Sequence, residues 1–344
     1  MSIYKKILER KPFIVAEAGV NHNGDIETAR QLVDAAGEAG ADAVKFQTFK
    51  AEKVVTVQSV KADYQLATTD PAESQLAMLK RLELSEANHR ELVQYCRKKK
   101  IPFLSTPFDA ESADLLEELG VPLFKIPSGE ITNLPLVEHI AKKGKPLIIS
   151  TGMSTLEDVR EAMAAVSKTG NREVVLLHCV TEYPAPVDQA NLKAMITLRD
   201  TFKVPVGFSD HTPGIEVAIA AVALGAQVIE KHFTLDKGME GPDHRASLEP
   251  RELREMVHRL RNVAMALGDG IKKPAPCEEK IALIARRSLV AAREIKKGKV
   301  IDREDIDIKR PGQGIPPREL GKVVGKKASA AILKDELIAW KKLV

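Results

Sequence analysis

Residues 147–178 read LIISTGMSTLEDVREAMAAVSKTGNREVVLLH, and this stretch indicates the class of fold. Its two ends, Leu147–Ser150 and Val174–His178, are short runs rich in apolar residues and predict buried β-strands. Between them, Thr155–Lys168 carries apolar residues three and four positions apart, a spacing that predicts an amphipathic helix. A strand, a helix and another strand in this order are typical of a parallel sheet.

The same alternation extends in both directions from this stretch and stops only near residue 268. It predicts eight strands, at Phe13–Ala18, Ala43–Phe46, Pro102–Ser105, Leu123–Ile126, Leu147–Ser150, Val174–His178, Val206–Phe208 and Val228–Lys231. Further helical periodicity is found at Asp25–Ala39, Glu86–Lys99, Gly214–Leu224 and Pro250–Leu267. Eight strand–helix units in about 260 residues favour a (β/α)8, or TIM, barrel. The first strand is not followed by a GxGxxG motif, which argues against a dinucleotide-binding sheet.

The regular alternation ends at Gly268, and the residues that follow differ in composition. Pro274 and Pro276 predict a stiff connector, and the remaining segment has short strand-like runs separated by glycines and prolines. We therefore predict an α/β chain with a (β/α)8 barrel at 1–270, a linker at 271–285 and a small β-rich domain at 286–344. A domain of about 60 residues buries little apolar surface, so we expect it to pack on another surface.

The 344 residues include 52 Lys and Arg against 48 Asp and Glu, a formal charge of +4 with both signs interspersed. This balance excludes the basic footprint of a nucleic-acid-binding protein but tolerates an anionic small substrate. No apolar run reaches the roughly 18 to 20 residues that a membrane span needs, so we expect a cytoplasmic protein without a membrane partner. The three cysteines, Cys96, Cys179 and Cys277, lack CxxC spacing, which disfavours a disulfide framework and a thiolate zinc site.

In (β/α)8 barrels the active site lies at the carboxyl ends of the strands, and polar residues gather at those positions in this sequence. They include Glu17, Lys45, Gln47, Thr106, Lys125, Ser128, Glu130, Ser150, Ser209, His211, Glu230 and His232. The segment Phe49–Asp70, after the second predicted strand, is too long for an ordinary loop between a strand and a helix. We predict that this segment forms a lid over the active-site end of the barrel.

Two lysines inside predicted strands, Lys45 and Lys125, are the strongest functional signal. Burying an unpaired ammonium group costs several kcal/mol, so each lysine needs an anionic partner. We expect a phosphate, or a phosphate and a carboxylate, to bind between them, with hydroxyl donors from Ser128, Ser150 and Ser209. The structural alternative is pairing with a neighbouring carboxylate, such as Glu17 or Glu130. A Schiff-base aldolase would instead need a single lysine of depressed pKa.

His211 and His232 end adjacent predicted strands, so their rings can converge above the barrel. Neutral imidazoles at such a point suit Zn, Mn or Fe, whereas the alternative is a pair of hydrogen-bonded strand-end residues. With Glu17, Glu130 and Asp243 within reach, this set suits carbon–carbon bond formation between a phosphorylated anionic donor and a carbonyl acceptor. We expect His178, inside an apolar run, to be a hydrogen-bonded core residue.

Eight ordered motifs carry a resemblance that spans nearly the whole chain. They are AEAGVNHNG (16–24), KFQ (45–47), STPFD (105–109), FKIPSGE (124–130), STGM (150–153), YPAP (183–186), FSDHTPG (208–214) and EKHFT (230–234). Together they resemble the bacterial N-acetylneuraminate (sialic acid) synthase family. The tail segments RSLV (287–290) and KRPGQG (309–314) resemble the antifreeze-like (SAF) domain of that family.

The resemblance implies condensation of phosphoenolpyruvate with an open-chain N-acylated aminosugar. By motif, Lys45, Lys125, Ser128 and Ser209 would hold phosphoenolpyruvate, and Thr106 and Ser150 would be further substrate-binding residues. His211 with His232 would bind a divalent metal, most often Mn2+, with Mg2+ or Co2+ as alternatives. Glu17 would handle the proton of the attacking water, and Gln47, Glu130, Tyr183 and Asp243 would face the sugar. Arg310 would come from the second subunit of a homodimer, whose small domain caps the partner barrel.

The resemblance leaves a choice of acceptor sugar. We rank unphosphorylated N-acetylmannosamine first, which would make the product N-acetylneuraminate, and diacetamido-deoxy sugars leading to legionaminic or pseudaminic acid second. A 6-phosphorylated acceptor ranks lower, since no second phosphate cradle is visible in the sequence. The chain has Thr181 where bacterial relatives often have Asn, a departure at one phosphate contact. A non-catalytic ice-binding role for the tail is disfavoured by its charges at 295–305.

Overall fold

The computed structural model describes residues 2–9 and 11–344. The chain forms two compact units, the first ending at Gly268 and the second beginning at Asp269. Within the described residues, the helices are all too short or too polar to cross a lipid bilayer.

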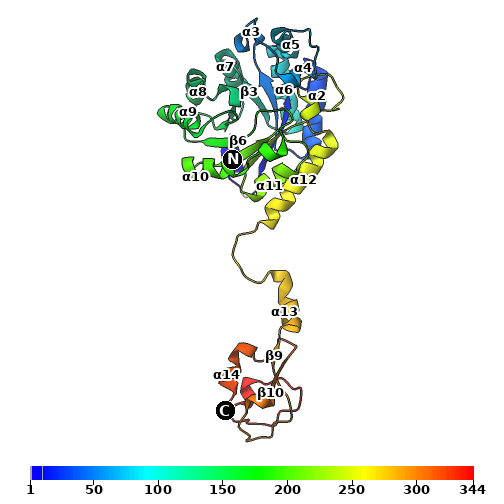
Figure 1. The fold of residues 1–344 in the computed structure, drawn as a ribbon, viewed down its shortest axis with the longest axis vertical. Helices are drawn as coiled ribbons and strands as arrows, with labels where there is room; N and C mark the ends of the chain where they lie inside the picture. Colours follow the sequence, from blue (N-terminus) through cyan, green and yellow to red (C-terminus); the bar gives the residue numbers. More distant parts are fainter. Residues whose placement is uncertain (1, 10) are drawn as a thin grey trace. The chain divides into compact units, whose positions relative to one another are not determined.

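The first unit is built on eight parallel strands that curve into a nearly closed barrel, so the predicted fold class is confirmed (Figure 1). The strands follow the order β3-β2-β1-β8-β7-β6-β5-β4, and β3 and β4 at its two ends contact each other. Their bounds are β1 Phe13–Gly19, β2 Ala43–Thr48, β3 Phe103–Pro107, β4 Phe124–Ile126, β5 Leu147–Ser150, β6 Val174–His178, β7 Val206–Asp210 and β8 Val228–His232. All eight runs predicted from the sequence are strands in the structure.

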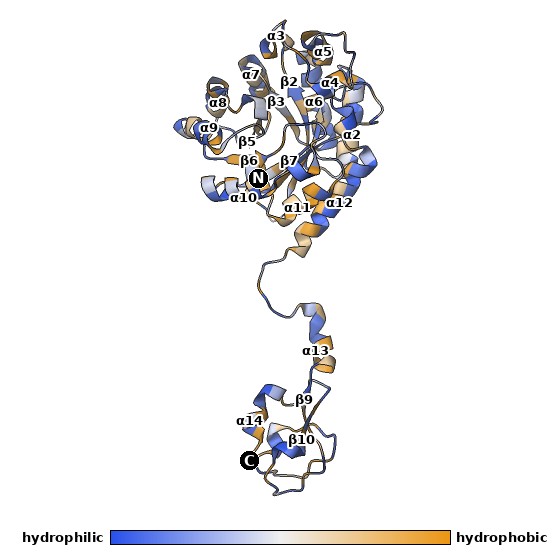
Figure 2. Cartoon of the chain, viewed as in Figure 1, coloured by the Kyte–Doolittle hydropathy of each residue, from blue (hydrophilic) through white to orange (hydrophobic). Residues whose placement is uncertain are grey.

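Helices surround the strands on the outside of the barrel (Figure 1). The longer ones are α2 Ile26–Ala39, α6 Glu86–Lys99, α7 Ala110–Glu118, α8 Leu134–Ala141, α9 Leu156–Lys168, α10 Lys193–Phe202, α11 Glu216–Ala223 and α12 Pro250–Ala266. Several begin at side chains that cap them: Asp25, Ser85 and Thr155 each accept a backbone N–H from the first turn. In Figure 2, α12 shows both hydrophilic and hydrophobic colours, as expected of a helix with one buried face.

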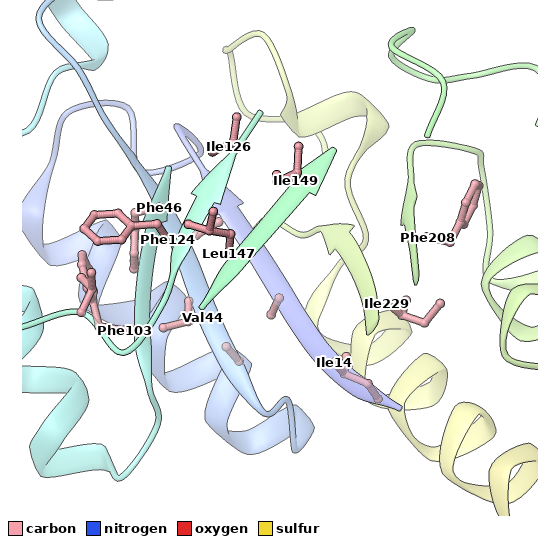
Figure 3. Packing of buried hydrophobic residues seen from close by; sticks show 14 of the residues in the cluster. Ile14, Val44, Phe46, Phe103, Phe124, Ile126, Leu147, Ile149, Phe208 and Ile229 are labelled. Carbon is pink, nitrogen blue, oxygen red and sulfur yellow. The ribbon is translucent and has the colours of Figure 1, made fainter. Parts of the chain in front are cut away.

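The apolar core of the barrel has two layers. Side chains on the outer face of the strands, such as Ile14, Phe46 and Phe208, pack against the helices (Figure 3). Side chains at the alternate strand positions, such as Phe13 and Val15, point inward and form a smaller cluster inside the barrel. The short helix α1 (Ile3–Ile7) contributes Ile7 to this inner cluster. The interior is therefore filled by side chains below the strand ends.

The segment that we predicted as a lid is partly helical. It contains α3 (Ala51–Val54) and α4 (Asp63–Leu66), and α5 (Gln75–Leu82) follows it. The buried Lys61 side chain ties the segment together by donating to Thr69 Oγ1 at 3.0 Å and to the Asp70 carbonyl at 2.7 Å. Its apolar residues form a cluster with Val20 and Phe108 of the barrel loops. The segment thus forms a wall at the carboxyl ends of the strands.

The second unit has its own apolar core and a two-stranded antiparallel sheet of β9 (Ser288–Ala291) and β10 (Ile306–Lys309). The core residues are Leu289, Ala291, Ile295, Ile301, Ile306, Ile315, Val323, Ala328, Ile332, Ile338 and Leu343. Short helices η4 (Pro276–Glu278), α13 (Glu279–Ala285) and α14 (Leu320–Val323) belong to the same unit. Part of the expected linker is therefore helical, and the Leu283 carbonyl accepts the Gly312 N–H at 2.8 Å.

Candidate active site

A cavity of about 300 Å³ opens at the carboxyl ends of the barrel strands. Twelve of the fourteen residues predicted for the site line it: Glu17, Lys45, Gln47, Thr106, Lys125, Ser128, Ser150, Tyr183, Ser209, His211, His232 and Asp243. The two exceptions are Glu130 and Arg310. The fold therefore brings together residues that are up to 226 positions apart, since Glu17 and Asp243 border the same space.

Alternation along each strand explains why these side chains enter the barrel. Successive residues of a strand point to opposite faces. In β1, Glu17 follows Phe13 and Val15 on the inward face, whose lower residues form the inner apolar cluster. In β8, Glu230 and His232 continue the inward row that begins with Val228. Each strand thus presents apolar residues in the middle of the barrel and polar residues at its mouth.

The two buried lysines meet carboxylates rather than solvent. Lys45 Nζ lies 2.8 Å from Glu17 Oε2 and donates to Thr106 Oγ1 at 2.9 Å. Lys125 Nζ donates to Glu230 Oε1 at 3.3 Å, and Lys45 Nζ lies 3.7 Å from the same oxygen. The protein itself therefore supplies an anion between the two ammonium groups.

The sequence-based pairing of a lysine with Glu130 is wrong. Glu130 lies in the short 3-10 helix η1 (Ser128–Glu130), is half-buried, and accepts a hydrogen bond from Asn133 Nδ2 at 2.7 Å. Because β4 already ends at Ile126, Glu130 is no longer on an inward-facing strand position. Its side chain does not border the cavity. The pairing of Lys45 with Glu17 is the part of that alternative that the structure contains.

The sequence places Glu230 at the active-site end of the eighth strand, but sequence reasoning gave it no role in the site. The signal was present, because Glu230 stands two positions before His232 on β8 and shares its inward face. The intervening Lys231 lies on the outer face of β8 and forms a buried ion pair with Asp210 at 2.8 Å. Ser209, opposite Glu230 in the β7–β8 register, donates to Glu230 Oε1 at 3.0 Å. Glu230 is thus the acceptor on which the two strongest anion-binding candidates and a hydroxyl converge.

Burial and neighbouring charges shift the two central carboxyl groups in opposite directions. Burial raises the pKa of Glu17 to about 7, against the lowering influence of Lys45. Burial also acts to raise the pKa of Glu230, but Lys125 and Lys45 outweigh it and lower that pKa to about 2. At neutral pH Glu230 is therefore an anion, whereas Glu17 is close to its point of half-protonation.

The two histidines lie side by side at the ends of β7 and β8, with ring centroids 5.6 Å apart. Burial lowers the pKa of both, to about 4 for His211, so both rings are neutral at neutral pH. His211 Nδ1 donates to the Val180 carbonyl at 2.6 Å, which leaves the lone pair on Nε2. His232 Nδ1 is buried without a hydrogen-bond partner and lies 3.8 Å from Asp243 Oδ2.

These features suit a divalent cation with two imidazole ligands and further positions left for water or substrate. Among residues 2–9 and 11–344, no three His, Cys, Asp or Glu side chains are already grouped to hold a metal ion. The protein groups that fit a cation here are therefore the two neutral rings, with the Asp243 carboxyl beside His232. Burial raises the pKa of Asp243 to about 6.

Small polar side chains surround Gly152, just after β5. Gly152 N–H donates to Ser128 Oγ at 3.0 Å, and Ser128 Oγ lies 3.1 Å from Cys179 Sγ. A Cβ at Gly152 would collide with Thr181 Oγ1 and Ser128 Oγ, so only glycine permits this close approach. Ser150 Oγ and Thr181 Oγ1 are buried without hydrogen-bond partners. Unpaired buried hydroxyl groups are costly, so these two positions suit a polar group of a ligand.

The part of the cavity formed by residues 49–82 is mostly apolar and carries no charged side chain. Residues 49–82 line it with Phe49, Val54, Val55, Met78, Leu79 and Leu82, together with the uncharged polar side chains of Tyr64, Gln65 and Gln75. Tyr183 stands between the two sides, with its ring centroid 4.3 Å from that of His211 and 5.2 Å from that of Tyr64. The cavity therefore has a charged half at the strand ends and an apolar half formed by the segment after β2.

Two further predictions concern residues outside this cavity. His178 donates a ring N–H to the Ala190 carbonyl at 2.9 Å, as expected of a hydrogen-bonded core residue. Arg310 belongs to the second unit, where it is exposed. Its assignment to a site shared with a partner subunit stays a prediction.

The fold and the cavity define a (β/α)8 barrel of the enzyme type, with ammonium, carboxyl and imidazole groups at its carboxyl mouth. The NeuB family model matches residues 32–272, and the SAF domain model matches residues 286–344. The chain belongs to the NeuB family and carries a SAF domain, so it is an enzyme of the sialic acid synthase type.

Individual relatives agree with this assignment. The chain is 53% identical to the N,N'-diacetyllegionaminic acid synthase of Campylobacter jejuni over 96% of this chain and 99% of the relative. It is 49% identical to the protein of the same name from Legionella pneumophila, over 95% of this chain and 93% of the relative. Among solved structures, an N-acetylneuraminic acid synthetase from Leptospira borgpetersenii is similar, with a TM-score of 0.71 and 35% identity over 79% of this chain and 90% of that chain.

Proposed function

We propose that this protein is an N,N'-diacetyllegionaminic acid synthase, which condenses phosphoenolpyruvate with a diacetamido-deoxy sugar and releases phosphate. The sequence alone placed N-acetylmannosamine first and the diacetamido sugars second. Two relatives at 53% and 49% identity bear the name of the second activity, which reverses that order. The observation on which the proposal depends is the division of the cavity into a charged and an apolar half.

The apolar half suits the acceptor. A diacetamido-deoxy sugar carries a methyl group at C6 and two acetamido methyl groups, and each apolar carbon buried contributes roughly 0.8 kcal/mol. The hydroxymethyl group of N-acetylmannosamine would gain less there, because six of the nine lining residues between 49 and 82 are apolar and none is charged. The lining residues between 49 and 82 include no lysine or arginine, so a 6-phosphate would find no cation on that side.

The charged half suits the donor. Lys45 and Lys125 supply two ammonium groups, and Ser128, Ser150 and Thr181, which line the same cavity, supply hydroxyl groups. Phosphate and carboxylate groups are bound in proteins by such charge-assisted hydrogen bonds. Thr181 stands where relatives often have Asn, and its hydroxyl is free to donate to the phosphate.

The reaction begins with the donor between the two lysines and the acceptor aldehyde beside it. The C3 carbon of phosphoenolpyruvate attacks the aldehyde carbon of the open-chain sugar, and the aldehyde oxygen takes up a proton. Water then adds to the electron-poor C2 carbon, and the C2–O bond to phosphate breaks to leave the 2-keto acid. Glu17, whose pKa lies near 7, accepts the proton that the water loses.

A divalent metal would be held by His211 and His232, with Asp243 beside them, and would polarise the aldehyde as a Lewis acid. We assign Mn2+ first, with Mg2+ or Co2+ as alternatives, because imidazole sites take several first-row ions according to their availability. Tyr183 packs on the ring of His211 and keeps its orientation fixed. His211 is held further by its hydrogen bond to the Val180 carbonyl.

We also propose a homodimer in which the SAF domain of one subunit caps the barrel of the other and brings Arg310 to the acceptor sugar. The support for this proposal is the SAF assignment of residues 286–344 and the exposure of Arg310 on that unit. Sedimentation of the full chain, followed by assay of mixed subunits that carry Arg310→Ala or Lys125→Met, tests it. Recovery of activity on mixing supports shared sites, whereas two impaired variants whose mixed dimer is no more active than either parent contradict them.

A panel of acceptor sugars tests the activity itself. The purified chain is given phosphoenolpyruvate, Mn2+ and either 2,4-diacetamido-2,4,6-trideoxymannose, N-acetylmannosamine or its 6-phosphate, and the products are identified by mass. We expect kcat/KM for the diacetamido sugar to exceed that for N-acetylmannosamine by about 10- to 200-fold, the range that small apolar groups provide. Leu79→Gln should reduce this preference and leave the KM for phosphoenolpyruvate unchanged. Equal or greater efficiency with N-acetylmannosamine would contradict the proposed acceptor.

A further inference from the structure

The Glu230 carboxylate occupies an unusual place for a negative charge. Its Oε1 oxygen receives Lys125 Nζ at 3.3 Å and Ser209 Oγ at 3.0 Å, and Lys45 Nζ is 3.7 Å away. Its Oε2 oxygen is buried and has no hydrogen-bond partner. The side chain borders the cavity and is only 5% exposed.

A carboxylate in this position opposes the binding of an anionic donor. Two like charges a few ångströms apart repel strongly in a site from which water is largely excluded. A glutamine would accept the same hydrogen bonds from Ser209 and Lys125 without that repulsion. Lys45 does not depend on Glu230 for an anionic partner, because Glu17 Oε2 lies closer, at 2.8 Å. Binding of the donor therefore does not account for the charge on Glu230.

The charge has a use once the donor reacts. When C3 of phosphoenolpyruvate attacks the aldehyde, the electron pair of the C2–C3 double bond becomes the new carbon–carbon bond. The C2 carbon is then left electron-poor, as an oxocarbenium ion, until water supplies a new pair of electrons and loses a proton. A fixed anion beside this carbon is more favourable in the transition state than in the ground state, which is the condition for catalysis.

On the basis of the proposed condensation, we propose that Glu230 is a charge-stabilising residue for the positive charge that develops on the donor during carbon–carbon bond formation. The two lysines and Ser209 hold its Oε1 oxygen, so the carboxylate is preorganised and needs no rearrangement at the moment of reaction. Its free Oε2 oxygen is the atom available to face the reacting carbon. The lysines thus bind the donor and orient the anion that promotes its reaction.

Substitution of Glu230 by Gln separates this role from the others. We expect Glu230→Gln to bind phosphoenolpyruvate at least as tightly as the wild-type protein in calorimetry with Mn2+ and without acceptor, because a repulsive charge is removed. We expect kcat in the full reaction to fall about 100-fold, comparable to the loss of one preorganised electrostatic group. Glu230→Asp keeps the charge and should recover part of kcat at an unchanged dissociation constant. Thermal unfolding of each variant establishes that it is folded.

Other outcomes overturn the proposal. Weaker binding of phosphoenolpyruvate by a folded Glu230→Gln variant would mean that Glu230 serves to align the lysines for the donor. A kcat within tenfold of the wild-type value would mean that its charge has no role in the reaction. If the Gln variant does not fold, the Asp variant decides: a lower kcat at an unchanged dissociation constant supports the proposal, and a wild-type kcat overturns it. Wild-type protein that consumes no phosphoenolpyruvate with any acceptor would instead refute the proposed function.

Discussion

Replacement of Lys125 by Met tests the donor site directly. Lys125 is buried, and its Nζ atom donates to Glu230 Oε1 at 3.3 Å inside the cavity. Met has a similar length and no charge, so the substitution removes one ammonium group from the proposed phosphoenolpyruvate site and leaves little empty space. A charge-assisted hydrogen bond contributes about 1.5–3 kcal/mol, which corresponds to a loss of about 10- to 150-fold in kcat/KM for phosphoenolpyruvate.

The barrel should survive this substitution. Removing one partner of a buried ion pair costs about 3–5 kcal/mol when the other charge is left uncompensated. In this case Glu230 still has Lys45 Nζ at 3.7 Å and Ser209 Oγ at 3.0 Å, so we expect a smaller cost, about 1–2 kcal/mol. For a unit of this size the cost lowers Tm by less than about 8 °C.

The assay is release of inorganic phosphate with saturating acceptor and Mn2+ while phosphoenolpyruvate is varied. Lys143→Met is a matched control, because Lys143 is also largely buried but pairs with Asp114 at 2.5 Å and Glu117 at 2.7 Å before the start of β5, away from the cavity. The control should keep wild-type kinetics. If Lys125→Met also keeps them, the assignment of this lysine to the donor site is refuted. An equal loss in both variants would point to general destabilisation.

Three further predictions follow from the site and from the second unit. His232→Ala should weaken Mn2+ binding at least tenfold by calorimetry while the circular dichroism spectrum stays unchanged; unaltered binding would exclude the ring as a ligand. Because burial raises the pKa of Glu17 to about 7, kcat/KM should fall about tenfold per pH unit below that value as the base becomes protonated. Glu17→Gln should abolish most activity, and the remaining activity should no longer show this fall at low pH. Burial acts to raise the pKa of Asp305, but Lys299 and Arg293, each 2.6 Å away, help to lower it to about 2. The Asp305 carboxylate therefore stabilises the second unit above about pH 4, and this stabilisation is lost as the pH falls toward 2. Asp305→Asn should destabilise that unit by about 2 kcal/mol in urea unfolding of the full chain and make it less sensitive to acid; an unchanged midpoint would contradict this role.

Most of the fold follows from patterns that are local in the sequence. Short apolar runs and amphipathic segments such as Leu147–Ser150 and Thr155–Lys168 specify strands and helices through burial and periodicity, and their strict alternation limits the topology to parallel units. The rule that barrel enzymes react at the carboxyl ends of their strands then selects residues such as Glu17, Lys45 and His232 without knowledge of any contact.

Contacts across the barrel required the tertiary structure. Glu230 on β8 meets Lys125 on β4, and these strands are not neighbours in the sheet, so only the curvature of the closed barrel brings them together. Glu130 is a residue that the sequence motif places in the site and the structure does not. Its motif is intact, but the chain has already left the strand and the Glu130 side chain does not border the cavity. Alternation along a strand is a local property, so the sequence was enough to place strand residues such as Glu17 and His232 at the mouth. Only the folded chain decided which charges face each other and which half of the cavity is apolar, because those depend on distances between segments far apart in the sequence.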